Sequence, residues 1–468
     1  MLDTFDLTDP LARGLVQHAR ALGEALAGFD GDQDDADDLI ALVATLEDLK
    51  CRAEGAQVVA SAAFDAAQRA EQAAAGVPVE RQGQGVGLQV ALARRESHHR
   101  GQRHLGLART LVGELPCTLQ ALRAGRISEW RATLVARETA CLLREHRAEV
   151  DQRLGDDDLH SWGERELLGE LRRIAYRLDA ESVVSRRRHA ESERTVSLRP
   201  APDTMTYLTA LLPVAEGVGA YAALTRAADT ARADGDERSR GQVMADLLVT
   251  RVLSQPDGGR PQIPVTVNVV VSDQVLLGAG DGDTGGSAEV DGYGPVPGSL
   301  ARDLTTAGPE VAVAIRRLYA RPAEGGLVAM DSRARCFPAG LAELIRLRDR
   351  TCRTPWCDAP IRHTDHVRPV ADAGFTTATN GQGLCEACNY AKQAPGWTQQ
   401  VVDGLRHEVI TATPTGQTYR SAAPPCPRPA AVTESPADRR YELSQRCDLS
   451  RRAGSPLEMA LARHLHAA

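Results

Sequence analysis

Lysine is almost missing from this sequence. Lys and Arg together number 55, yet the only lysines are Lys50 and Lys392, so nearly all the positive charge is arginine. The formal net charge is −8 and the pI is about 5.9. These values exclude a globally basic nucleic-acid binder. A locally basic face is still allowed, because attraction to phosphate acts over roughly one Debye length, about 10 Å.

Aromatic residues and long apolar runs are also scarce. Aromatics make up 4% of the chain, so the core must rest on Ala, Leu and Val, and such stretches favour helix. No run approaches the ~18 consecutive apolar residues of a membrane span. The first ten residues are acidic and lack the basic-then-apolar order of a secretory signal. We therefore expect a cytoplasmic protein with no membrane partner.

The first 275 residues predict a mostly helical domain with a few strands. One apolar stripe follows the i, i+3, i+4, i+7 spacing of a buried helix face, at Leu39, Leu42, Val43, Leu46 and Leu49. Similar patterns run through 52–74, 103–124, 129–146 and 163–178, and further helices are expected over 204–232 and 238–254. Residues 195–199 and 262–272 predict strands, the latter because it is rich in valine.

The remaining chain divides into three parts. Residues 276–335 predict a Gly/Pro-rich linker and connecting region, with a flexible loop over 278–300. Residues 336–412 predict a small domain, with a helix at 341–350 and a β-hairpin made of 397–402 and 407–411. Residues 413–468 are rich in Pro and Arg, which favours a disordered tail.

Cysteine is concentrated in the small domain. Four of the ten cysteines lie in one window with the spacing C-x4-C, 27 residues, then C-x2-C: Cys352, Cys357, Cys385 and Cys388. Two close thiolate pairs suit tetrahedral zinc, and four sulfur ligands leave no open position, so the zinc would be structural. A module with so little apolar content needs such a metal to fold. The alternative is four unrelated buried thiols.

The 27-residue insert is longer than a plain zinc ribbon needs, and it contains polar residues in a recognisable order. Asp365 and His366 are adjacent, Asn380 precedes a glycine, and Asn389 and Lys392 follow the second cysteine pair. Asn389 and Lys392 are three residues apart and fall on one face of the expected helix. Zinc would therefore connect the strand with Asp365 and His366 to the helix with Asn389.

This window resembles the ββα-metal fold of HNH nucleases. The resemblance is carried by Asp365-His366 with Val367 and Pro369, by an Asn five residues before a cysteine, and by C-x2-C-N. The rest of the chain resembles a bacterial group that places a long helical domain of unknown function, number 222, before the HNH unit. Residues 122–128, 199–213 and 413–425 carry that part. The expected fold class is thus mainly α, with a large helical N-terminal region, a small zinc-stapled HNH domain and a disordered tail.

The resemblance implies hydrolysis of double-stranded DNA. His366 would be the general base, since a neutral imidazole near pH 7 can take a proton from the attacking water. Asp365 and Asn389 would hold Mg²⁺ or Mn²⁺, which neutralises charge developing on the phosphate. Asn380 would fix the loop that carries His366. For the phosphate backbone, Lys392 and Arg368 are the candidate contacts.

Each assignment has an alternative. Asp365 could instead be an exposed acid on the surface, and His366 a residue that only packs in the core. A regular strand would point the side chains of these two neighbours to opposite faces. Asn380 would suit a plain turn, and Asn389 a cap or a solvent-facing residue. For His363 we expect a structural role near the site, and not the role of a metal ligand.

Two arginine- and histidine-rich stretches, 94–104 and 186–194, would suit either a DNA backbone or solvated helix faces. Two rivals to the nuclease remain open. One is a zinc-containing DNA-binding protein without catalysis, and the other is a helical scaffold whose zinc unit only nucleates folding.

Overall fold

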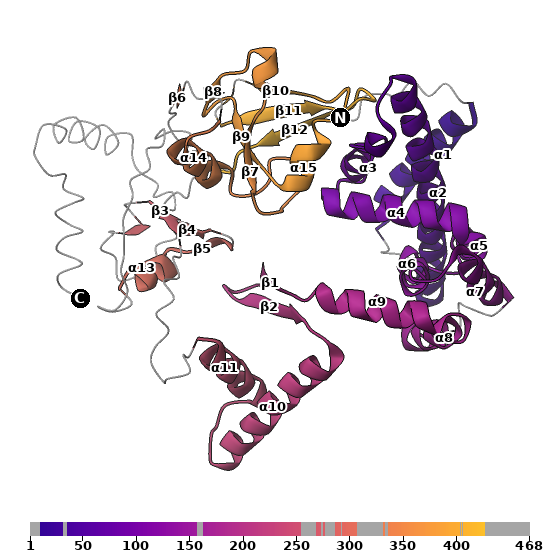
Figure 1. The fold of residues 1–468 in the computed structure, drawn as a ribbon, viewed down its shortest axis with the longest axis horizontal. Coiled ribbons are helices and arrows are strands. Elements are labelled where there is room, and N and C mark those ends of the chain that lie inside the picture. Colours follow the sequence, from indigo (N-terminus) through magenta and orange to yellow (C-terminus); the bar gives the residue numbers. More distant parts are fainter. Residues whose placement is uncertain are drawn as a thin grey trace, which may run out of the picture. The chain divides into compact units, whose positions relative to one another are not determined.

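The computed structural model describes residues 10–30, 35–156, 162–253, 268–272, 275–276, 286–291, 293–306, 331–332, 336–402, 404 and 406–425. Its first part is helical, and its last described part consists of small sheets and short helices (Figure 1). This confirms the predicted mainly α class. Within these residues, no helix has the length and apolar content needed to cross a membrane.

The N-terminal helices follow the predicted apolar patterns. Their bounds are α1 Pro10–Ala27, α2 Ala36–Ala74, α3 Val86–Arg94, α4 His98–Glu114, α5 Pro116–Arg123, α6 Glu129–Glu138, α7 Arg144–Asp156, α8 Glu164–Leu178 and α9 Ala180–Ser192, with a 3₁₀ turn η1 at Val79–Arg81.

These helices do not form one body. Residue contacts divide the chain into two compact units, Met1–Ala60 with Leu107–Asp179, and Ser61–Gly106 with Ala180–Ala468. The predicted 1–275 helical region is therefore split between the units, and α3 falls in the unit that contains the cysteine window.

In the first unit a buried carboxylate organises a helix start. Asp151 of α7 accepts hydrogen bonds from the backbone N–H groups of Cys117 and Thr118 at 2.7 and 2.9 Å, and from the Thr118 hydroxyl at 2.6 Å. These amides are among the donors that a helix leaves unpaired at its N-terminus. Pro116 begins α5, a position where a missing N–H costs nothing. Asp151 therefore fixes α5 against α7.

The second unit continues with a hairpin where a helix was expected. Strands β1 Thr195–Pro200 and β2 Thr206–Leu211 pair antiparallel, so the helix predicted over 204–232 is wrong at its start. Thr206, Tyr207 and Thr209 are strand formers, and that preference prevails here. The helices that follow are α10 Val214–Ala233 and α11 Arg240–Leu253.

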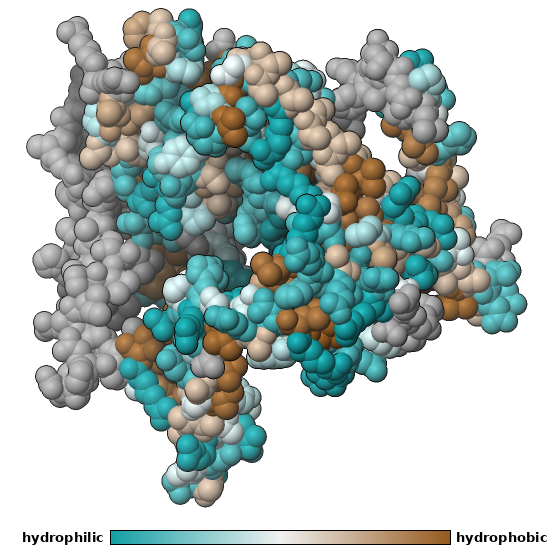
Figure 2. Space-filling view, turned by 45° about the vertical axis from the view of Figure 1, so that its right-hand side comes forward, coloured by the Kyte–Doolittle hydropathy of each residue, from teal (hydrophilic) through white to brown (hydrophobic). Residues whose placement is uncertain are grey.

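Large apolar side chains are exposed on this part of the chain. Val214, Val218 and Val252 are 84%, 66% and 66% exposed, and Figure 2 shows hydrophobic residues at the surface over α10 and α11. These helices thus contribute little to the core that positions the site.

The end of the strand predicted over 262–272 and the predicted linker together form a small sheet. Strands β3 Val269–Val271, β4 Ser287–Val290 and β5 Gly294–Pro297 pair antiparallel, and α13 Gly298–Thr306 follows. Ala288, Val296 and Ala301 form its buried core. The flexible loop expected over 278–300 is therefore corrected for 286–300, because alternate small apolar residues there pack on α13. Residues 262–267 of the predicted strand lie outside the described residues.

The last part contains the cysteine window. Its helices are α14 Ala339–Asp349 and α15 Glu386–Ala391, with a 3₁₀ turn η2 at Val370–Asp372. Its strands form three sheets: β6 Asp331–Ser332 with β8 Thr376–Thr377, β7 His363–His366 with β9 Gly381–Leu384, and β10 Thr398–Val402, β11 Glu408–Ala412 and β12 Thr418–Ala422 in that order.

The predicted helix at 341–350 and the hairpin are confirmed, but the tail begins later than predicted. β12 pairs with β11, from Thr418 opposite Ala412 to Ala422 opposite Glu408, so the boundary at 412 cuts through a three-stranded sheet. Sequence composition missed β12 because the surrounding Pro, Ser and Arg mask a five-residue strand. Residues 426–468 lie outside the described residues.

Candidate metal centre

Four cysteine sulfurs meet in one buried cluster. Their Sγ atoms all lie within 4.8 Å of one another, and Cys357 Sγ is 3.8 Å from Cys385 Sγ and 3.7 Å from Cys388 Sγ. A tetrahedral zinc with Zn–S bonds near ~2.3 Å requires sulfurs about 3.8 Å apart. The same separation is far too long for a disulfide, whose S–S bond is about 2.05 Å. The arrangement therefore fits the predicted structural zinc, and disfavours four unrelated thiols.

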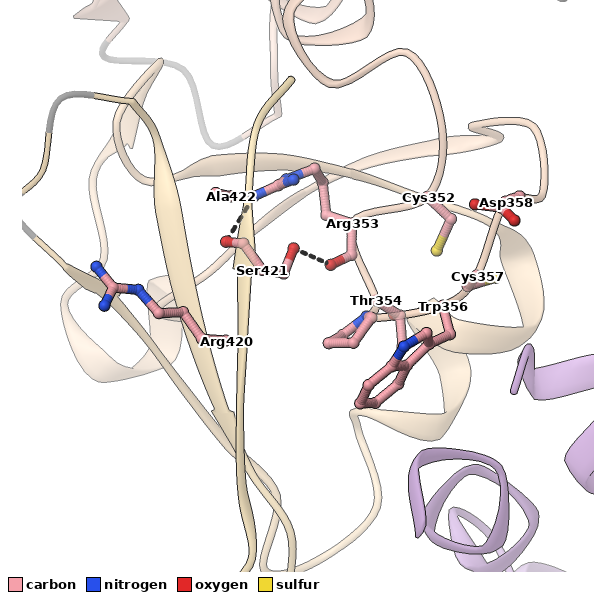
Figure 3. A pocket seen from close by; sticks show the side chains of 10 residues that line it. Cys352, Arg353, Thr354, Trp356, Cys357, Asp358, Arg420, Ser421 and Ala422 are labelled. Carbon is pink, nitrogen blue, oxygen red and sulfur yellow. Dashed lines mark hydrogen bonds between the residues drawn. The ribbon is translucent and has the colours of Figure 1, made fainter. Parts of the chain in front are cut away.

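The first cysteine pair sits on a tightly bonded loop. The Cys352 N–H donates to Ala359 O at 2.9 Å, and the Cys357 N–H donates to Thr354 O at 3.0 Å. Figure 3 shows this loop beside β12, where the Ser421 hydroxyl donates to Arg353 O at 2.6 Å and Arg353 Nη2 donates to Ser421 O at 2.8 Å. The strand that lies beyond the predicted domain boundary thus holds the cysteine loop in place.

The second pair begins helix α15. Cys385 is the N-cap residue, and its sulfur accepts the backbone N–H of Cys388 at 3.4 Å. Hydrogen bonds from the neighbouring cysteine thiols lower the pKa of Cys385, with the Cys388 N–H adding to the effect. A thiolate is the form that binds metal. The sequence C-x2-C therefore places both sulfurs at the start of the helix.

A helix from far earlier in the chain covers this cluster. Leu88, Ala91 and Leu92 of α3 share one buried core with the four cysteines, Ala391, Ala394 and Trp397. Gln84 Nε2 donates to Tyr390 O at 2.7 Å, and the Thr415 hydroxyl donates to Gln89 Oε1 at 2.8 Å. Residues near 85–92 thus complete the core around the four cysteines, although the sequence predicts that they belong to a separate domain.

Asp365 and His366 end strand β7 side by side. Asp365 Oδ1 accepts the backbone N–H of His366 at 2.8 Å and lies 3.8 Å from His366 Nδ1. A regular strand would separate the two side chains, but the carboxylate turns back onto the next residue. His366 is 7% exposed, its Nε2 lies 3.0 Å from the Thr376 hydroxyl, and the Phe337 ring lies 4.6 Å from its ring between centroids.

Lys392 reaches this pair from the end of α15. Its ammonium donates to Asp365 Oδ2 at 2.8 Å and to His366 O at 2.7 Å, and its side chain is only 10% exposed. Both bonds point into the protein, whereas the sequence predicted Lys392 as a candidate contact with phosphate. Lys392 instead joins α15 to the end of β7.

Asn389 is buried on the same helix, and its Oδ1 has no hydrogen-bond partner among the described residues. Residues three apart share a helix face, so Asn389 lies on the side from which Lys392 reaches β7. An unpaired buried amide oxygen costs roughly 1–3 kcal/mol. A cation bound to the Asn389 Oδ1 atom would explain why this buried oxygen has no hydrogen-bond partner. Oxygen donors of this kind suit Mg²⁺ or Mn²⁺.

Asn380 closes the loop between β7 and β8. Its Oδ1 accepts the Arg368 N–H at 2.9 Å, and its Nδ2 donates to Arg368 O at 3.0 Å and to Phe375 O at 2.9 Å. These bonds occupy the amide, so Asn380 holds backbone and leaves little for a ligand. Arg368 itself is exposed at one end of this loop.

The local charges shift two pKa values. Burial alone would raise the pKa of Asp365, but the charge and hydrogen bond of Lys392, with the His366 N–H, lower it below its usual value. Burial lowers the pKa of His366, and the Asp365 carboxylate opposes that shift without cancelling it. The pair is therefore a carboxylate beside a neutral imidazole near pH 7.

Sequence reasoning missed Thr376 and Phe337, which hold the His366 ring. Nothing in the spacing distinguishes Thr376 from Thr377, and Phe337 lies before the cysteine window. His363 packs its ring against Tyr390 at 5.9 Å between centroids, in line with a structural role. Of the basic stretch at 94–104, His98 is buried and His104 bonds Glu96 at 2.8 Å, so only part of it faces solvent.

Two comparisons with known proteins found a match. An uncharacterized protein of Mycobacterium tuberculosis is 34% identical over 114 residues, which is 20% of this chain and 21% of that protein. The chain thus spans about a fifth of the length of this curated relative. No solved structure matches. The family model described as a domain of unknown function (DUF222) matches residues 43–349 and ends before the cysteine cluster. Since that match covers more than half of the sequence, the chain belongs to the DUF222 family.

Proposed function

We propose that this protein is a metal-dependent endonuclease of the HNH type that hydrolyses phosphodiester bonds in double-stranded DNA. The observation that carries the proposal is the meeting of the Asp365 carboxylate and the His366 imidazole at the end of β7, beside the helix that bears Asn389. A base next to a carboxylate and an unpaired amide oxygen is what metal-assisted hydrolysis requires.

The roles divide between two metal sites. The four cysteines would hold Zn²⁺, which ties β9 and α15 to the loop at 352–357. Asp365 and Asn389 would hold Mg²⁺ or Mn²⁺, which stabilises negative charge on the phosphate and on the leaving oxygen when bound. Both Asp365 oxygens already accept a hydrogen bond, but each keeps a second lone pair for a cation.

His366 would remove the proton from the attacking water. Its lowered pKa keeps the ring neutral near pH 7, which is the state that accepts a proton. Lys392 would hold Asp365 in place through its two inward hydrogen bonds. Arg368, exposed at the start of the loop that Asn380 closes, remains the candidate contact with phosphate.

One observation favours a non-catalytic alternative. The Lys392 ammonium already balances the Asp365 carboxylate, so the site is electrostatically satisfied without a divalent cation. A zinc-containing DNA-binding protein or a helical scaffold would need nothing more. The nuclease proposal differs from these alternatives in two ways: the protein should cut DNA, and the cutting should depend on an ion that a chelator can remove.

A plasmid-nicking assay on the full chain tests the proposal. We expect cutting in Mg²⁺ or Mn²⁺ that is lost on addition of EDTA, and lost in His366→Ala while zinc content stays at one per chain. His18→Ala is the matched control, because it also removes a histidine, and His18 is exposed on α1, outside both basic stretches. Absence of cutting by the wild-type protein across both metals and a range of DNA substrates would leave the non-catalytic alternative standing.

A further inference from the structure

The turn from α3 into α4 carries an exposed positive surface. Arg95, His99 and Arg103 are all exposed there, and we call these three residues the α3–α4 corner. His99 and Arg103 are four residues apart, so their side chains share one face of α4. His98 and Leu105 are buried on the other side of the helix. Because α3 packs on the core around the four cysteines, the corner belongs to the same module as the candidate metal centre.

The protein does not neutralise the charge of this corner. Among the described residues, neither the Arg95 nor the Arg103 guanidinium has a hydrogen-bond or ion-pair partner. The nearest acid in the sequence, Glu96, lies 2.8 Å from His104 Nε2 and 4.0 Å from Arg100 Nη1. On a chain of net charge −8, two unpaired guanidiniums next to each other form a local surface that complements a polyanion.

The backbone of Arg95 has a conformation that favours glycine. Arg95 is the C-cap residue of α3 with φ +59° and ψ +44°, and its N–H donates to Leu92 O at 3.1 Å. Glycine is the usual residue at such a helix end, because a side chain in the left-handed region costs free energy. An arginine here therefore works against stability while its side chain lies in solvent. A role in binding explains its presence better than a role in folding does.

The second basic stretch, at 186–194 on α9, is different in its charge. Glu191 and Glu193 lie between its basic residues, and Glu193 Oε1 is 3.6 Å from His189 Nε2. Acids on the same turn repel a phosphate backbone. The structure therefore favours the α3–α4 corner over α9.

We infer that the α3–α4 corner binds the sugar-phosphate backbone of double-stranded DNA. The two guanidiniums would bind phosphate oxygens, and an N–H group of the His99 ring would be a further donor. DNA as the partner rests on the proposed nuclease function, and the corner would hold the duplex on the module that carries Asp365 and His366. Contacts with phosphate carry no sequence information, so the corner would add affinity for DNA of any sequence.

Fluorescence anisotropy with a short labelled duplex tests the inference. The zinc-loaded full chain is titrated at several salt concentrations without added Mg²⁺ or Mn²⁺. The logarithm of the association constant falls with the logarithm of the salt concentration, with a slope of about −0.9 for each phosphate contact. We expect Arg95→Gly and Arg103→Gln each to make this slope shallower by about 1, and the double variant by about 2, on duplexes of unrelated sequence.

Urea unfolding of Arg95→Gly separates binding from folding. Because glycine adopts φ +59° without strain, the urea midpoint of this variant should be unchanged or higher although its DNA affinity falls. A lower midpoint would contradict the argument from the Arg95 backbone and assign this arginine to the fold.

Arg20→Gln with Arg177→Gln is the matched control, because it removes the same charge at exposed arginines of α1 and α8, outside both basic stretches. Its slope should equal that of the wild type. A corner double variant with the wild-type slope, an equal change in the control, or a wild type that binds no duplex would overturn the inference. If the wild type cuts DNA and the corner variants bind as before, the nuclease proposal stands alone. Shallower slopes in a protein that cuts no DNA would keep the inference and remove the nuclease.

Discussion

A substitution at Gly85 tests how helix α3 packs against the core around the four cysteines. It precedes α3 with φ +82°, and an added Cβ would lie 2.6 Å from Trp397 Nε1 and 3.1 Å from Ala394 Cβ. Those two side chains belong to the core around the four sulfurs. Gly85→Ala must therefore either push α3 away from the module or distort the segment after α15.

The magnitude follows from two contributions. A non-glycine residue in the left-handed region costs about 1 kcal/mol, and forcing a methyl group into a packed interface costs about 1–3 kcal/mol more. We expect Gly85→Ala to lower the free energy of unfolding by about 2–4 kcal/mol. Gly76 provides the control, because it has φ +77° and nothing within 4 Å of an added Cβ. Gly76→Ala should lose only the backbone part, about 1 kcal/mol.

The assay is urea unfolding of the zinc-loaded chain, followed in parallel by tryptophan fluorescence and by zinc released to a colorimetric chelator. Replacing glycine with alanine also makes the unfolded chain less flexible, which stabilises both variants equally. The difference between their free energies of unfolding therefore isolates the contact with Trp397. Gly85→Ala should also release zinc faster than Gly76→Ala. Equal losses of stability and equal rates of zinc release would refute the claim that α3 completes the module.

Two further predictions concern the same module. Cys385→Ser should lose zinc, and the region around 352–425 should unfold. The reason is that the apparent binding energy of structural zinc, about 10–16 kcal/mol, is comparable to the whole stability of a domain. Cys336→Ser is the control: Cys336 is an exposed free cysteine, so this variant should keep its zinc in the same metal analysis. Burial, with the charge of Arg348 second, lowers the pKa of His407 to about 4. At about 1.4 kcal/mol per pKa unit, the difference from 6.5 corresponds to about 3 kcal/mol of stability, which is present above pH 6.5 and lost as the pH falls toward 4. His407→Gln has no such group, so its urea midpoint should depend less on pH over that window, and parallel pH profiles of the two proteins would contradict the assignment.

Local sequence signals determined the elements with strong periodicity or fixed spacing. The helices of the first 190 residues, α14 and the β10–β11 hairpin follow from apolar periodicity and turn residues. The C-x4-C and C-x2-C pairs predicted a buried four-sulfur cluster, which the structure shows. Each helix and hairpin depends on residues close together in the chain, and so does each of the two cysteine pairs that form the cluster. For that reason pattern and propensity were sufficient.

Only the tertiary structure decided what surrounds the cluster. Contacts between Gly85 and Trp397, and between Thr376 and His366, join segments that no spacing rule relates. Lys392 was recognised as unusual from composition, but its inward bonds to Asp365 and His366 depend on where α15 packs against β7. β12 was missed because Pro, Ser and Arg surround its five residues, and only its pairing with β11 identifies it as a strand. Sequence therefore specified the four cysteines of the cluster and the adjacent Asp365 and His366, while long-range packing decided which other side chains hold them.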